Sequence, residues 1–76
     1  MSGPQQIDLF ERQAEDAYRR MYDATSPSDA TARYSDAKEA LHTAIGLARD
    51  LGNEVRAGQL ERRLAEIKAV FRSQFS

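Results

Sequence analysis

Small residues recur along one side of the segment RYSDAKEALHTAIGLARDLGN, residues 33–53, and this pattern constrains the fold more than any other feature of the chain. Alanines alternate with larger apolar side chains at steps of three and four, the spacing that keeps side chains on one face of an α-helix. The stripe is wider than one neighbouring helix requires, so it predicts a central helix packed between two others. Alanine lets two helix axes approach closely, and larger side chains of the neighbours then fill the space. The stripe consists of Tyr34, Ala37, Ala40, Leu41, Ala44, Ile45, Leu47, Ala48 and Leu51.

Local signals predict where this helix and its neighbours begin and end. Ser26 can cap a helix with its hydroxyl, and Pro27 suits a first turn because that position needs no amide donor. Gly52 can adopt the left-handed conformation that ends a helix, and Asn53 can cap the next one. Connections of a few residues place consecutive helices antiparallel, so we expect a single all-α domain over residues 1–76. The expected helices span about 4–24, 27–51 and 53–74.

The two flanking helices each have a narrower apolar face. On the first, acidic residues precede basic ones by four positions, a spacing that predicts solvent-exposed ion pairs of about 0.2–0.5 kcal/mol each. These expected pairs are Asp8/Arg12, Glu15/Arg19 and Asp16/Arg20. The apolar positions of the first helix are Phe10, Ala14, Ala17, Tyr18 and Met21, and those of the third are Leu60, Leu64, Ile67, Val70 and Phe71.

Composition excludes several classes of protein. The chain has 76 residues, no cysteine, eleven basic and twelve acidic residues, and a net charge of −1. A disulfide framework and a thiolate zinc site are therefore impossible, and the weak overall charge argues against nonspecific binding to nucleic acid or membrane surfaces. The longest run of small or apolar residues, 44–48, is far shorter than a membrane span, and the first residues lack an export signal. We therefore expect a cytoplasmic protein.

The first two expected helices resemble a tetratricopeptide repeat. That family has one helix with a small or apolar series stepped by three, one and three, then a second helix that opens on an aromatic residue with alanines three and ten positions later. Here Tyr18 stands where the family usually has a small residue, and the connection TSPSDATAR is longer than the family's turn. The resemblance implies a helical hairpin, with the third helix as the cap that seals such arrays. The matching residues are Ala14, Ala17, Tyr18 and Met21, then Tyr34, Ala37 and Ala44, and the closing element LARDLGN at 47–53.

The residue pattern does not favour catalysis or metal binding. His42, the only histidine, is predicted on the polar side of the central helix, where it lacks the shielded partner that a general base needs. A metal site with Glu39 would have too few ligands, and the four glycines form no phosphate-binding loop. We therefore expect neither an enzyme nor a bound metal or cofactor.

An accessory role in nucleic-acid binding is the weakest of the alternatives. The basic residues of the third helix scatter around its polar arc among Glu61 and Glu66, and no aromatic side chain lies among them to stack on a base. These basic residues are Arg56, Arg62, Arg63, Lys68 and Arg72.

The remaining reading is a small protein–protein interaction or assembly module that recognises a protein or peptide. The resemblance implies that the first helix faces the ligand, because tetratricopeptide units generally present that helix. On it, Tyr22 lies opposite the apolar arc, where the fold is expected to have no use for it, and it would supply a rigid aromatic contact. The competing interpretation is a solvated face with Glu15/Arg19 pairing. The predicted partner-binding residues are Arg12, Glu15, Arg19, Tyr22 and Asp23.

A structural protein that associates with itself is the main alternative. Val70, Phe71 and Phe75 cluster near the carboxyl end, where a small monomer has little left to cover them. The sequence thus also predicts a possible homodimer that uses these three residues.

Overall fold

The computed structural model describes residues 3–75, which form three α-helices joined by short turns. The helices are α1 (Gly3–Tyr22), α2 (Pro27–Asp50) and α3 (Glu54–Gln74). The prediction of an all-α fold with three helices is confirmed, and each boundary lies within two residues of its expected position.

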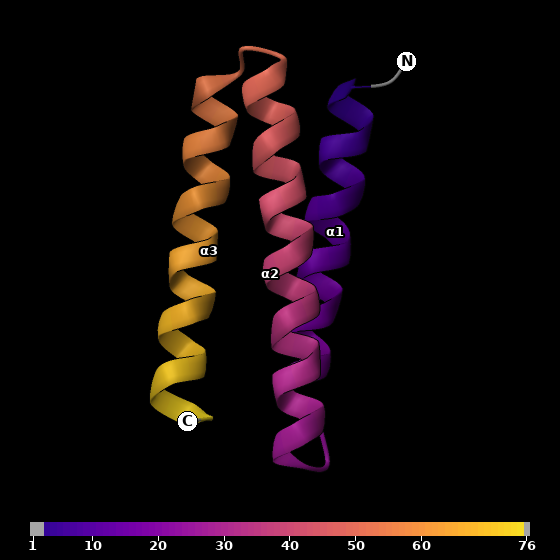
Figure 1. The fold of residues 1–76 in the computed structure, drawn as a ribbon, viewed down its shortest axis with the longest axis vertical. Helices are drawn as coiled ribbons and strands as arrows, with labels where there is room; N and C mark the ends of the chain where they lie inside the picture. Colours follow the sequence, from indigo (N-terminus) through magenta and orange to yellow (C-terminus); the bar gives the residue numbers. More distant parts are fainter. Residues whose placement is uncertain (1–2, 76) are drawn as a thin grey trace.

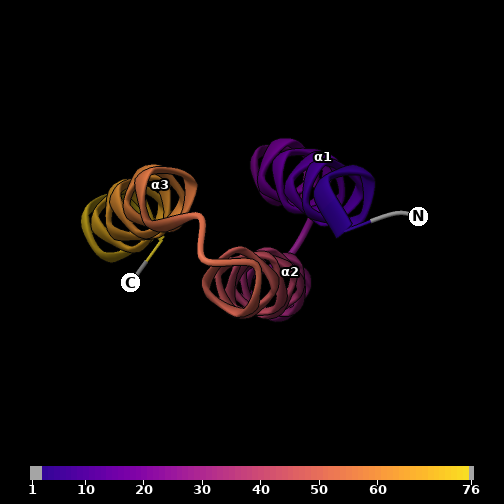
Figure 2. The ribbon, with the colours of Figure 1, turned by 90° about the horizontal axis from the view of Figure 1, so that it is seen from above.

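The central position of α2 is confirmed as well. α1 and α3 both run antiparallel to α2 and therefore parallel to each other (Figure 1). Seen along the helix axes, α1 and α3 lie on the same side of α2, so the cross-section is a V with α2 at its apex (Figure 2). The molecule measures 38 × 21 × 12 Å.

Capping interactions define the ends of α2 and the start of α3. The Ser26 hydroxyl accepts a hydrogen bond from the Asp29 amide at 3.1 Å, and Pro27 occupies the first turn. At the other end Gly52 has φ +74°, and the Asn53 amide donates to the Ala48 carbonyl at 2.8 Å, which satisfies a carbonyl of the last turn. Asn53 Oδ1 then accepts from the Arg56 amide at 3.1 Å and caps α3.

The predicted alanine-lined packing surface of α2 is buried. Ala37, Ala44 and Ala48 have no exposed surface, and Leu41 beside them is equally buried. Larger side chains from the neighbouring helices complete the core, because the alanines leave room for them. The fully buried large residues are Ile7, Met21, Leu41, Leu60 and Ile67.

The two flanking helices pack on α2 to different extents. α1 follows α2 closely along its length, whereas α3 contacts α2 over a smaller area, and the backbones of α1 and α3 make little direct contact. Long side chains join α1 to α3 instead. Their contacts decide which side chains of the two helices remain free for a functional site.

Candidate functional site

The residues of the predicted partner-binding face do not share one environment. Arg12 and Arg19 on α1, and Asp23 directly after it, are exposed, as expected. Tyr22 retains 46% of its surface, while Glu15 is partly buried. The structure therefore leaves four of these residues on the surface, although Tyr22 packs on one side against Phe75, and it draws Glu15 into contact with α3.

Glu15 pairs with α3 instead of with Arg19. Its two carboxylate oxygens accept hydrogen bonds from Nε and Nη2 of Arg63, both at 2.7 Å. The Arg63 guanidinium also lies 4.9 Å from the centre of the Tyr18 ring. The hydrogen bonds that Arg63 donates to Glu15 raise the pKa of Arg63 and outweigh the opposing effect of burial, and Glu66 adds to the rise. This bidentate pair contradicts the expected intrahelical pair Glu15/Arg19.

A second arginine joins α1 to α3 one heptad earlier. Arg56 Nη2 lies 2.7 Å from Asp8 Oδ1 and 2.5 Å from Glu11 Oε1. The hydrogen bond to Asp8 is the main reason why the pKa of Arg56 is raised. The predicted pair of Asp8 with Arg12 is therefore also wrong, whereas the pair of Asp16 with Arg20 is confirmed at 3.2 Å.

The sequence contains a signal for these cross-helix pairs that local spacing misses. Asp8 and Glu15 are seven residues apart on α1, and Arg56 and Arg63 are seven apart on α3. Both bridges therefore join residues 48 positions apart, as two parallel helices in a single register require. Matching repeats of opposite charge on the first and third helices predict such contacts once the two are known to be parallel.

Aromatic side chains join the helices at their other end. The Tyr22 ring meets Tyr18 at 5.4 Å and Phe75 at 5.5 Å, both edge to face. The hydroxyls of Tyr18 and Tyr22 are 3.4 Å apart, and this hydrogen bond is the largest cause of the raised pKa of Tyr18. The expectation that the fold has no use for Tyr22 is therefore wrong, because this residue links α1 to the end of α3.

The residues predicted for self-association are partly covered within one chain. Val70, Phe71 and Phe75 are each partly buried. The Phe71 ring stacks on Tyr34 of α2, with centroids 3.9 Å apart and planes within 2° of parallel, and Phe75 packs against Tyr22. The expectation that a monomer has little to cover them is wrong for Phe71 and Phe75, which Tyr34 and Tyr22 cover, while self-association through the three residues stays a prediction.

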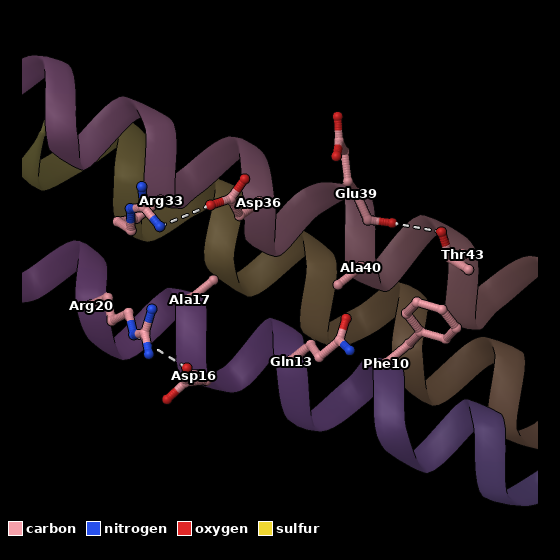
Figure 3. Close-up of a pocket in the computed structure, with 10 residues that line it drawn as sticks. All are labelled: Phe10, Gln13, Asp16, Ala17, Arg20, Arg33, Asp36, Glu39, Ala40 and Thr43. Carbon is pink, nitrogen blue, oxygen red and sulfur yellow. Dashed lines mark hydrogen bonds and ion pairs between the residues drawn. The ribbon is translucent and has the colours of Figure 1, made fainter.

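A groove of about 360 Å³ runs between α1 and α2 (Figure 3). Its lining combines small and aromatic residues, including Ala17, Ala40 and Phe10, with charged ones that pair with each other. Arg20 pairs with Asp16 within α1, and Arg33 binds Asp36 at 3.1 Å within α2. Glu39 adds a third carboxylate to these two pairs, so the lining carries one negative charge in excess.

The helix-three arginines and His42 show no arrangement for chemistry. Arg56 and Arg63 are engaged with α1, so they are not available as part of a nucleic-acid face. His42 is exposed on α2, as predicted. Within residues 3–75, no group of three or more histidine, aspartate or glutamate side chains is placed to hold a metal ion. None of the helices in this described part is long and apolar enough to cross a membrane.

Comparison with known proteins adds no relative. No protein-family model, curated protein or solved structure matches the chain. The functional conclusion therefore depends on the surface that the three helices present.

Proposed function

We propose that this chain is a small protein–protein interaction or assembly module without catalytic activity, similar in design to a single tetratricopeptide unit with a capping helix. The proposed partner is a protein or peptide met in the cytoplasm. The observation that carries the proposal is the half-exposed Tyr22 ring, which Tyr18 and Phe75 hold in place from two sides.

A half-exposed tyrosine of this kind suits a binding contact. Tyrosine offers a large apolar ring and a polar hydroxyl, and it is enriched among the residues that dominate binding energy. Because its neighbours already restrict the ring, binding would cost less side-chain entropy than it would for a freely rotating residue. Arg19 lies one turn before Tyr22 on α1, and Asp23 follows Tyr22 directly after the helix; both are exposed and would meet charges of opposite sign on the partner.

The proposed face is smaller than the one expected from sequence. Glu15 contributes to the fold through Arg63, so it is assigned no direct role in partner binding. Arg12 stays on the same outer side of α1, beside the 49% exposed Leu9 in a shallow hollow.

A charge reversal that spares the aromatic contacts tests this proposal. The variant Arg19→Glu with Asp23→Lys changes two exposed residues beside Tyr22, and Val55→Ala at the far end of α3 is the matched control because Val55 is 74% exposed. Both variants should keep the helicity and melting temperature of the parent chain. In a quantitative pull-down, we expect a specific partner to be lost with the charge reversal and retained with the control. Capture of the same proteins by all three chains would contradict the proposed face.

The alternative of a self-associating structural protein is less favoured. Phe71 and Phe75, which helped to motivate it, already contact aromatic rings of the same chain. A sedimentation measurement at tens of micromolar protein distinguishes the alternatives, because a homodimer through this end would have twice the 8.5 kDa mass of the chain.

A further inference from the structure

The chain has only two lysines and one histidine, and all three line the same hollow. The hollow has a volume of about 310 Å³ and lies where α2 meets α3. Lys38 and His42 belong to α2, and Lys68 belongs to α3. Ser35 and Glu39 complete the lining.

These lysines differ from most of the arginines in having no acidic partner. Within residues 3–75, at least six of the nine arginines form ion pairs with carboxylates, whereas neither Lys38 nor Lys68 forms one. Because both ammonium groups line a single hollow, no ion pair offsets the repulsion between their like charges. Among the described residues Glu39 forms no ion pair with either lysine, and with His42 neutral the two lysines leave the lining one positive charge in excess of Glu39.

Lys38 is also restrained by an aromatic ring. Its ammonium lies 4.4 Å from the centre of the Tyr34 ring, a cation–π contact, and that ring stacks on Phe71 of α3. Lys68 precedes Phe71 by one turn of the same helix. The ring stack therefore ties together the two helices that bring the two lysines to one place.

We propose that this hollow binds a phosphoryl group, either as free phosphate or on a small phosphate ester. A phosphoryl group carries close to two negative charges near neutral pH and three acceptor oxygens. It can therefore accept hydrogen bonds from Lys38, Lys68 and the Ser35 hydroxyl at the same time, which a carboxylate with two oxygens and one charge cannot do equally well. His42 supplies a further ring nitrogen at the rim. The hollow is lined by residues of α2 and α3, whereas the proposed interaction face lies around Tyr22 at the end of α1.

Titration with inorganic phosphate, pyrophosphate and a small phosphate ester, each followed by amide NMR shifts of the full chain, tests the proposal. We expect saturable shifts in residues 35–42 and around Lys68 in the millimolar range, and little response to acetate at equal ionic strength. If the ester binds more tightly than free phosphate, the ester is the ligand class. If free phosphate binds more tightly, the ligand is the free anion.

Variants that remove the same charge at the hollow or elsewhere distinguish a specific site from nonspecific attraction of anions. Lys38→Gln with Lys68→Gln should weaken binding by about tenfold or more, because each substitution removes a charge-assisted hydrogen bond. Lys38→Arg with Lys68→Arg should retain binding, and this pair remains informative if the glutamine pair lowers stability. The control is Arg12→Gln with Arg62→Gln, which removes two exposed charges elsewhere and should leave affinity unchanged. The absence of saturable shifts, or an equal loss in the control, would overturn the proposal.

Discussion

α1 uses its two sides in different ways, one against α2 and the other against α3. Against α2 it buries small and apolar residues such as Ala14 and Met21, which have no exposed surface. Against α3 it uses partly buried ion pairs, centred on Glu15 with Arg63. The comparison shows that short side chains bring helices close enough to form a core, whereas long charged ones can join two helices whose backbones stay apart.

Overpacking the interface between α1 and α2 should give the largest effect. Ala44 is fully buried, and Ala44→Leu forces extra atoms into a close-packed region, which should lower the free energy of unfolding by about 1–3 kcal/mol. Urea denaturation measures the change. Ala32→Leu, on the exposed side of the same helix, should change it by no more than about 0.5 kcal/mol. Equal stabilities of the two variants would show that α1 and α2 are not closely packed at this position.

The ion pair between α1 and α3 should have a smaller effect that depends on salt. A double-mutant cycle with Glu15→Gln and Arg63→Gln should give a coupling energy near 1 kcal/mol, the upper end for ion pairs that keep some exposure. About 1 M salt should reduce it, because the screening length falls to about 3 Å. The same cycle on Asp16 and Arg19, whose side chains are 45% and 74% exposed, should give only a few tenths of a kcal/mol. A coupling at Glu15 no larger than at Asp16 would mean that the bridge does not hold α3 in solution.

The smallest predicted effect is a loss of stability at alkaline pH, which depends on the hydrogen bond between Tyr18 and Tyr22. The hydrogen bond with Tyr22, followed by burial, raises the pKa of Tyr18 above its ordinary value of 10.0. A raised pKa means that the fold favours the neutral phenol, so this contribution to stability is complete below pH ~10 and is lost as pH rises through the raised pKa.

Tyr22→Phe removes the hydroxyl that makes this hydrogen bond but keeps the ring. We expect the variant to lose less stability than the parent chain between neutral and alkaline pH, as followed by urea denaturation across that range. Tyr34→Phe is the control, because Tyr34 stacks on Phe71 and lies outside the Tyr18 contact. If Tyr22→Phe and the parent chain lost the same stability at alkaline pH, groups other than Tyr18 would be responsible for the loss.

Most of the fold could be predicted from the sequence because its signals are local. Ser26, Gly52 and Asn53 each act within a few residues, through a cap or a left-handed turn, and each does in the structure what its position predicts. The alanine stripe is also a property of one helix, so its width alone indicated two neighbours. The order of three short-linked helices then left α2 in the centre.

The surface could be predicted only in part, because its contacts join segments that are far apart in the chain. Glu15 has a basic residue four positions ahead, but it pairs with Arg63, which is 48 positions away and offers two donors in a fixed plane. Tyr22 looked unused for the same reason, since the ring that meets it, Phe75, lies at the end of another helix. Periodicity places a residue on a face of its own helix and does not say what stands opposite that face.

The odd number of antiparallel helices has a mechanical consequence. α1 starts at one end of the long axis and α3 finishes at the opposite end (Figure 1). A pulling force applied at these two points would draw α1 and α3 in opposite directions along α2, so it would load both helix contacts in shear and spread the tension along their length. A two-helix hairpin pulled from its ends would instead open one turn at a time. In this arrangement, tension along the 38 Å long axis acts on both helix contacts at once instead of on one turn.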